Sequence, residues 1–204
     1  MERLPRSYYL NDTLYIAKDL LGKVIVHNSP EGLTAGRIVE VEAYIGPNDR
    51  ASHAYKNLRS KRTAIQFGLG GYAYIYQIYG MYYCFNIVTQ IENKPEVVLV
   101  RAVEPTIGIP MMMKRRRYSQ SNRLKNLTNG PGKLCQALGI DKHLYGQDLC
   151  GDVLYLADDG FYASNSEITQ TTRINIDYAA EDKDLPWRFY LTGNPYVSKV
   201  SKLP

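Results

Sequence analysis

The chain has 204 residues, of which 45% are hydrophobic and 22% are charged. This apolar content suffices for a core and excludes an intrinsically disordered chain. The longest apolar stretches are interrupted well before they reach membrane-spanning length, which excludes a transmembrane protein. The amino terminus also lacks the basic and then apolar pattern of a signal peptide. We therefore expect one domain over residues 1–204 that stays in the cytoplasm.

The charge balance and the cysteines narrow the functional classes. Lysine and arginine number 25 against 20 aspartates and glutamates, so the formal net charge is +5, which favours an anionic partner without requiring one. Cys84, Cys135 and Cys150 are far apart and form no C-x-x-C pair, so they predict neither a disulfide framework nor a metal site. The excess of tyrosine over phenylalanine, 18 against 4, fits half-buried strands or a surface that uses the hydroxyl groups.

The first half of the chain predicts one helix and then antiparallel strands. The helix begins after a cap at Asn11 or Asp12 and ends before Gly22. Two strands joined by a turn at residues 29–32 follow, the second ending near Tyr44. Further strands are predicted over residues 72–79, 81–89 and 96–103. The short connections between them predict an antiparallel meander.

The second half is more mixed. A helix is predicted over residues 106–117, although Gly108 and Pro110 disfavour helical structure near its start, and a polar loop is predicted over residues 118–129. Pro131 opens a short helix that Gly139 ends. Strands are predicted over residues 152–156, 171–176 and 188–191. Together with the first half, this order predicts an α+β fold.

Two glutamates and an aromatic ring share one face of the predicted strand over residues 36–44. Strand alternation places Glu40, Glu42 and Tyr44 together and places Val39 and Val41 on the opposite face. If the valine face is the core, both glutamates are simply solvated, which is the ordinary case. A carboxylate beside a ring is also what a general base needs in a pocket for a flat ligand.

Arg101 alternates with Val97, Leu99 and Val103 on a face that is otherwise apolar. A buried guanidinium needs a partner. A structural salt bridge is the usual answer, and an active-site arginine that holds a carboxylate, a phosphate or a water is the less common one. Glu42 is a candidate partner for Arg101.

Six tyrosines lie within the fifteen residues from position 72 to position 86. Tyr72, Tyr74 and Tyr76 share a strand face, which core and cross-strand packing explains. Tyr79 lies at the predicted turn, where a wedge between nucleic-acid bases is one use for an exposed ring. Asn86 is expected to point inward, where its amide needs partners.

Basic residues cluster at positions 59–62, 114–117 and 123–125, and such clusters are usually solvated surface. The run Gly130-Pro131-Gly132-Lys133 offers a helix amino terminus and a lysine to a phosphate, although this signal alone is weak. His53 lies in a G-P-N-D-R-A-S-H loop that is also compatible with an ordinary turn. The sequence contains no phosphate-binding loop, dinucleotide fingerprint or nucleophile elbow.

Five segments together closely resemble the alkyladenine (3-methyladenine) DNA glycosylase family. In order, they are G-R-I-V-E-V-E-A-Y-I-G-P-N-D-R-A-S-H, Y-I-Y-Q-I-Y-G-M-Y-Y-C-F-N, V-L-V-R-A-V-E-P, N-G-P-G-K-L-C-Q-A-L-G-I and W-R-F-Y-L-T-G-N-P-Y-V-S. The resemblance spans most of the chain from about residue 20 and is weakest over residues 111–129 and 146–170. The compact chain is most similar to bacterial members.

The resemblance implies roles for the matching residues around the reaction centre. Glu42 matches the catalytic glutamate that activates the water attacking C1′ of the damaged nucleotide. Arg101 matches the arginine that helps to hold this water and the glutamate. Tyr44 on one side, and His53 with Tyr76 on the other, match the rings that enclose the flipped base.

Three further matches concern selectivity and DNA contact. Tyr79 matches the residue that fills the gap left in the duplex. Asn86 matches the asparagine at the pocket floor whose side chain would collide with the 2-amino group of normal guanine. Lys133, with Gly132, is carried over only as a contact to the DNA backbone.

The resemblance implies a base-excision-repair DNA glycosylase. Such an enzyme flips alkylated or deaminated purines, such as 3-methyladenine, 7-methylguanine, hypoxanthine and ethenoadenine, out of duplex DNA and hydrolyses the N-glycosidic bond. It is monofunctional and needs no metal or cofactor. We expect a single domain with a curved antiparallel β-sheet surrounded by helices, a monomer, and association with the nucleoid if the source is bacterial. A non-catalytic module that binds damaged DNA and a nucleosidase stay open as alternatives.

Overall fold

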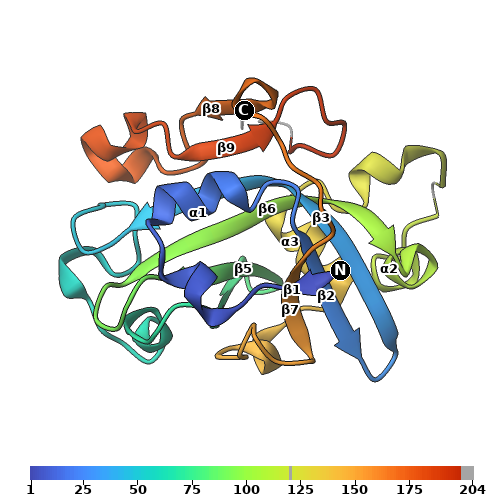
Figure 1. Cartoon of the computed structure of the whole chain (residues 1–204), viewed down its shortest axis with the longest axis horizontal. Coiled ribbons are helices and arrows are strands. Elements are labelled where there is room, and N and C mark those ends of the chain that lie inside the picture. Colours follow the sequence, from blue (N-terminus) through green and yellow to red (C-terminus); the bar gives the residue numbers. More distant parts are fainter. Residues whose placement is uncertain (120, 199–204) are drawn as a thin grey trace.

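In the part of the chain that the structure describes, a nine-stranded antiparallel sheet forms the centre of the fold (Figure 1). The computed structural model describes residues 1–119 and 121–198, without the side chains of residues 121–123. Along its main path the sheet has the order β1-β7-β2-β3-β6-β5-β4, and β9 pairs with both β3 and β8. The strands are β1 (Glu2–Arg3), β2 (Val24–Ser29), β3 (Gly32–Ile45), β4 (Ala73–Ile78), β5 (Tyr82–Thr89), β6 (Glu96–Ile107), β7 (Leu154–Asp158), β8 (Ile168–Thr171) and β9 (Arg188–Leu191).

The long strand β3 joins the two ends of this sheet. Its first half pairs with β2 and its second half with β9, while β6 pairs along its other edge. Glu42 lies opposite Leu99 and Tyr44 lies opposite Val97, so these side chains share one face as predicted from alternation. The register shifts locally on both sides of Glu40. Such an irregularity bends a strand and increases its twist.

Three α-helices lie in the described part of the chain: α1 (Thr13–Asp19), α2 (Ile109–Arg115) and α3 (Pro131–Leu138). The side chain of Asp12 accepts hydrogen bonds from the backbone N–H groups of Leu14 and Tyr15, so Asp12 is the cap of α1. Gly139 ends α3 with a φ of 74°, as its position predicts. Within the described residues, no helix is long and apolar enough to span a bilayer.

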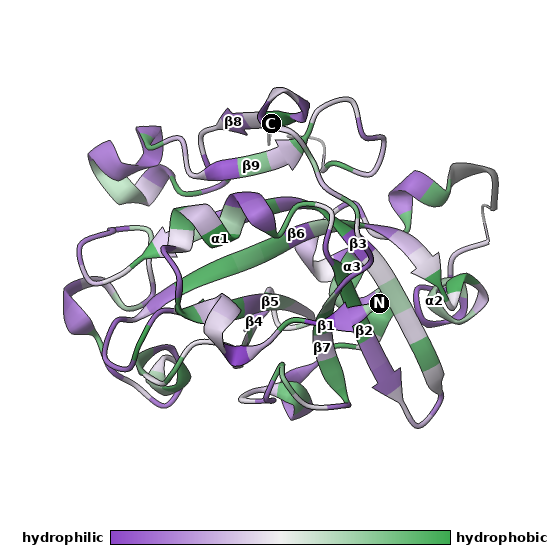
Figure 2. Cartoon of the chain, viewed as in Figure 1, coloured by the Kyte–Doolittle hydropathy of each residue, from purple (hydrophilic) through white to green (hydrophobic). Residues whose placement is uncertain are grey.

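Apolar clusters cover both faces of β3, so neither face of this strand is solvated. Helix α1 packs on β3 and β6, and α3 packs on β5 and β6. Ile16 of α1 belongs to the same apolar cluster as Val39 and Val41. A second cluster, around Tyr74 and Val97, lies on the opposite strand face. Figure 2 shows that hydrophobic residues gather on the central strands while the outer loops are largely hydrophilic. The α+β class with an antiparallel sheet is confirmed.

Several predicted boundaries were wrong. The strand expected over residues 171–176 is β8, which ends at Thr171. Residues 172–176 leave the sheet because Arg173 binds Asp49 and the Ile174 N–H donates to Glu42. Helix α2 begins only at Ile109, because β6 continues to Ile107. The strand predicted over residues 152–156 runs from Leu154 to Asp158, and the predicted polar loop contains a 3-10 helix, Ser121–Asn126.

Replacing Asp12 with alanine should lower the free energy of unfolding by about 1 kcal/mol, because two N–H groups at the start of α1 lose their acceptor. Urea denaturation measures the loss. Asn11→Ala is the matched control, since the Asn11 side chain donates to the carbonyls of Ser7 and Tyr8 and does not cap α1. A loss at Asn11 that equals the loss at Asp12 would contradict the assignment of the cap.

Candidate active site

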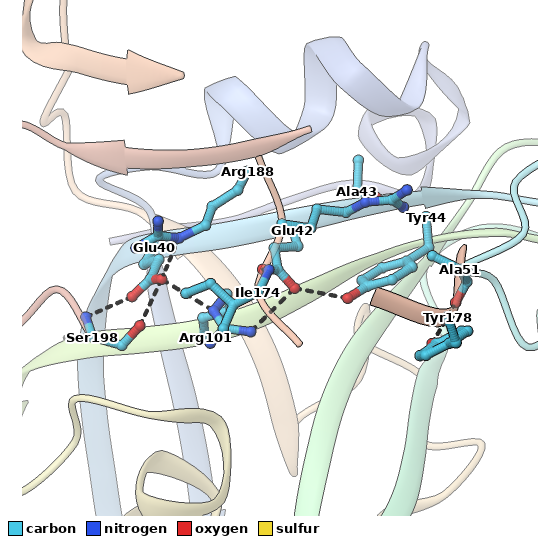
Figure 3. Close-up of polar contacts among 11 residues, drawn as sticks. Glu40, Glu42, Ala43, Tyr44, Ala51, Arg101, Ile174, Tyr178, Arg188 and Ser198 are labelled. Atoms are coloured by element: carbon cyan, nitrogen blue, oxygen red, sulfur yellow. Dashed lines mark hydrogen bonds and ion pairs between the residues drawn. The ribbon is translucent and has the colours of Figure 1, made fainter. Parts of the chain in front are cut away.

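Glu42 is a fully buried carboxylate that accepts hydrogen bonds at both oxygens (Figure 3). Its Oε1 accepts from the backbone N–H of Ile174 at 2.8 Å. Its Oε2 accepts from the Tyr44 hydroxyl at 2.7 Å and from Nη1 of Arg101 at 3.1 Å. All three partners are donors, which suits a carboxylate because it carries no proton of its own to donate. Glu42 and Arg101 are therefore partners, as expected.

Glu40 holds the other side of the same arginine. Its Oε1 accepts from Nε of Arg101 at 3.0 Å and from Nε of Arg188 at 2.8 Å. Ser198 adds its backbone N–H at 2.6 Å and its hydroxyl at 2.7 Å. Burial acts to lower the pKa of Arg101, but the carboxylates of Glu42 and Glu40 outweigh it and raise the pKa, so the guanidinium stays charged.

The interpretation of Glu40 and Glu42 as solvated side chains is wrong. Both are 0% exposed. The strand face that carries them is covered by residues 172–178 and by the segment that ends at Ser198, two parts of the chain that the strand pattern of β3 does not reveal. Two buried arginines, Arg101 and Arg188, form ion pairs with these glutamates, which is the condition for burying carboxylates without a large loss of stability.

Tyr44 forms one wall of a cleft beside Glu42. Burial, and then the neighbouring Glu42, raise the pKa of Tyr44, so its hydroxyl keeps the proton that it donates to Glu42. Arg173 lies 4.8 Å from the centroid of this ring, a cation–π contact. Arg173 also binds the fully buried Asp49 through two nitrogens, at 2.6 and 2.9 Å. This pair supports the Tyr44 ring.

His53 and Tyr76 form the other aromatic wall, with centroids 4.7 Å apart and nearly perpendicular rings. Arg62 contacts Nε2 of His53 at 2.9 Å. Because an arginine can only donate, Nε2 is the acceptor, and the Nδ1–H then donates to the Tyr74 hydroxyl, 2.8 Å away. Burial and the charge of Arg62 lower the pKa of His53 to about 4. The imidazole is therefore neutral near pH 7.

Two cavities adjoin at these walls and share Tyr44, Tyr76 and Tyr178. The larger, about 560 Å³, is lined by Arg101 and opens at the β4–β5 hairpin and the start of α3. The smaller, about 40 Å³, is lined by Asn86. Asn86 is buried, and its Nδ2 donates to the carbonyl of Tyr74 at 3.1 Å, so its amide finds the partner that an inward orientation requires.

Tyr79 lies at the tip of the β4–β5 hairpin and lines the larger cleft. Its side chain is 79% exposed and its φ is 51°, a left-handed conformation that is uncommon for a residue other than glycine. Gly80 follows with a φ of 67°. An exposed ring held in a strained turn is typical of a functional tip and has no packing explanation.

Gly132, Lys133 and Arg116 line the opposite edge of the larger cleft. A Cβ on Gly132 would meet the Tyr82 side chain at 2.9 Å, so glycine permits the close approach of α3 to β5. Lys133 donates to Asn129 at 2.8 Å, and burial and then Arg116 lower its pKa. Arg116, half-buried, belongs to a basic run that the sequence pattern indicated as solvated. In the run at residues 123–125, the side chain of residue 123 lies outside the described part.

The sequence reasoning missed the contribution of the segment after β8. Ile174 and Tyr178 line the larger cleft, and Arg173 supports the Tyr44 ring. Arg173 lies next to Ile174 in the segment T-R-I-N-I. An arginine beside apolar residues is the signal that identified Arg101, and the same signal could have identified Arg173. Gln66, which lines the smaller cavity, carries no such signal. The described residues contain no group of three or more His, Cys, Asp or Glu that could hold a metal ion.

Replacing Glu40 with glutamine should lower the free energy of unfolding by about 3 kcal/mol, because Arg101 and Arg188 lose a buried charge. Glu31→Gln is the control, since the Glu31 side chain is 67% exposed in its pair with Arg115 and should lose less than about 1 kcal/mol. Chemical denaturation of both variants gives the comparison. Equal losses would show that burial of the Glu40 carboxylate does not matter.

The comparison with known proteins shows the family of the chain. The methylpurine-DNA glycosylase family matches residues 7–195. A protein of Alkaliphilus oremlandii named "Putative 3-methyladenine DNA glycosylase" is 50% identical over 203 residues, which cover 97% of this chain and 99% of that protein. Proteins of the same name from Clostridium novyi, 50% identical over 98% of this chain and 100% of theirs, and from Bacillus thuringiensis, 48% identical over 96% and 98%, are similar throughout. The chain therefore belongs to the methylpurine-DNA glycosylase family of DNA-repair hydrolases.

Proposed function

We propose that this protein excises damaged purines from duplex DNA by activating a water molecule with Glu42. The relatives are named as 3-methyladenine DNA glycosylases, and one observation in this chain supports the same activity. A fully buried carboxylate, paired with an arginine, lies beside a cleft with aromatic walls, and an exposed ring projects from a hairpin at the mouth of that cleft.

Base flipping explains why the site has this shape. The sugar bond of a stacked base is out of reach, so the nucleotide must leave the duplex, at a cost of roughly a few kcal/mol that damage or mispairing reduces. Tyr79 would enter the duplex from the hairpin tip and take the place of the flipped base. The half-buried Arg116 and Lys133 near the mouth would face the phosphates, and binding should therefore weaken as salt rises.

The aromatic walls favour methylated purines. Tyr44 would stack on one face of the base, and Tyr76 with His53 would contact the other. 3-Methyladenine and 7-methylguanine carry a positive charge, which the faces of tyrosine rings attract. These bases also leave the sugar readily. Neutral lesions such as hypoxanthine and ethenoadenine leave less easily and depend more on the positioning of water.

The carboxylate of Glu42 has one lone-pair position without a donor. Its two oxygens offer roughly four lone-pair positions, and Ile174, Tyr44 and Arg101 occupy three of them. The remaining position, on Oε1, would accept a hydrogen bond from the attacking water. As the water oxygen bonds to C1′, its proton moves to Glu42, and the electron pair of the breaking C1′–N bond leaves with the base.

Asn86 would exclude normal guanine. The hydrogen bond from its Nδ2 to Tyr74 holds the side chain in the smaller cavity, where the 2-amino group of guanine would collide with it. 7-Methylguanine carries the same group, and its release would depend on its positive charge and its readily broken sugar bond. The enzyme proposed here is monofunctional, acts as a monomer without a cofactor, and takes double-stranded DNA with damaged purines as its substrate. In a bacterium its place of action is the nucleoid in the cytoplasm.

Glu42→Gln should slow base release by about 1,000-fold, because the amide cannot take the proton of the attacking water. Release of free base from duplex oligonucleotides with hypoxanthine or 1,N6-ethenoadenine measures the rate, and fluorescence anisotropy should show unchanged lesion binding. Turnover retained in the variant would overturn the mechanism. Binding without release by the wild type would leave a damage-recognition module, and release from free nucleosides that duplex DNA does not inhibit would indicate a nucleosidase.

Asn86→Ser should raise the release of normal guanine from undamaged duplex DNA by roughly 10-fold, because the shorter side chain removes the collision with the 2-amino group. Asn28→Ser, at an exposed position on β2, is the matched control and should release guanine at the wild-type rate. Equal guanine release by the Asn86→Ser and wild-type proteins would show that Asn86 does not exclude guanine.

A further inference from the structure

Gln66 is a buried amide without a hydrogen-bond partner. It lies in the 3-10 helix Ala64–Phe67 and is 1% exposed. Its amide lies close enough to the Tyr74 hydroxyl to act to lower the pKa of that group, but the geometry of a hydrogen bond is not met, so neither its Oε1 nor its Nε2 has a partner among the described residues. Buried polar groups are almost always paired, and leaving one unpaired is unfavourable. A glutamine with both groups unpaired therefore needs an explanation.

The position of Gln66 explains why its amide is unpaired. It lines the smaller cavity together with Asn86 and His53. The other amide and the imidazole of that cavity each make a hydrogen bond, since Asn86 donates to the Tyr74 carbonyl and His53 is bonded to the Tyr74 hydroxyl. Across the described residues, the other buried unpaired side-chain atoms belong to Tyr9 and Arg173, and neither of these residues lines the cleft or the smaller cavity. The unpaired amide of Gln66 thus belongs to a residue that lines the space behind the aromatic walls.

We propose that Gln66 reads the polar edge of the flipped purine, donating from Nε2 and accepting at Oε1. This inference rests on the function proposed above. The volume of about 40 Å³ is too small for a whole purine ring, so only an edge of the base enters, while the ring lies between Tyr44 and Tyr76 in the adjoining cleft. Gln66 is then a specificity-determining residue for the neutral and the methylated purines alike.

The chemistry of these bases fits an amide. Hypoxanthine and 7-methylguanine present an N1–H donor next to the O6 acceptor. 3-Methyladenine presents its 6-amino donor next to a ring-nitrogen acceptor. An amide matches either arrangement, because rotation of its terminal group exchanges the positions of oxygen and nitrogen. A site that is built to pair with such groups discriminates strongly against a base that lacks them, since its own buried groups then stay unpaired.

1,N6-Ethenoadenine provides the discriminating substrate. Its bridge ties N6 and N1 into a ring, so this edge carries one acceptor, N6, and no N–H group. Gln66 can donate one hydrogen bond to ethenoadenine but accepts none, whereas it makes two with hypoxanthine. Loss of the amide should therefore slow hypoxanthine release more than ethenoadenine release, a difference that a merely structural role would not produce.

The test compares Gln66→Met with the wild type in single-turnover release of both bases from otherwise identical duplexes. Hypoxanthine release should fall about 10-fold, ethenoadenine release should fall less, and the ratio of the two rates should shift accordingly. The melting temperature should stay equal or rise, because methionine leaves no partner unpaired. Gln170→Met is the control, since Gln170 is exposed on β8 and donates to the Pro186 carbonyl outside the cavity.

Each outcome decides the matter. If both lesions are released at unchanged rates, or slow by the same factor, Gln66 does not read the base, although the glycosylase itself stands. A lowered melting temperature in both Gln66→Met and Gln66→Leu would show a structural role and overturn the inference. If the wild-type protein releases neither base nor any methylated purine, the proposed function fails first, and the role of Gln66 falls with it.

Discussion

Four buried charges require three strands to lie side by side at the centre of this structure. Glu40 and Glu42 on β3 have no solvent exposure, and Arg101 of β6 and Arg188 of β9 accompany them. A buried charge that loses its partner costs several kcal/mol. The sheet therefore has to bring β3, β6 and β9 side by side, and the observed pairing does so. Ser198, from the last part of the described chain, completes the group with two more hydrogen bonds.

The same interactions fix the position of the Glu42 carboxylate, which the proposed mechanism requires. Glu40 takes the Nε of Arg101 and leaves Nη1 for Glu42, so the arginine is oriented by a residue that does not itself line the cleft. Glu42 is then held by three donors and keeps one position for water, in the mechanism proposed here. The stability of the network and the reactivity of Glu42 thus rest on one guanidinium. At Gln66, by contrast, function and stability conflict. An amide that is kept unpaired to bind the base lowers the stability of the free protein.

A second buried ion pair places the walls of the cleft. Asp49 lies in the loop that leads to His53, and Arg173 lies in the segment that leads from β8 to Tyr178. Their contact fixes both loops to each other, and the guanidinium lies on the Tyr44 ring. Loops carry much of the function of a fold but are mobile when unsupported. Here a fully buried charge pair gives two of them a defined position.

The sequence by itself determined the features that depend on neighbours along the chain. Alternation placed Glu40, Glu42 and Tyr44 on one face and Arg101 on the matching face, and the turn around Gly80 placed Tyr79 at a hairpin tip. These patterns, with the family resemblance, identified most of the candidate site. Only the tertiary structure decided that the glutamates are buried, that the Ile174 N–H binds Glu42, and that Gln66 has no hydrogen-bond partner among the described residues. Each of these depends on segments far apart in the sequence, and strand periodicity carries no information about what covers a face.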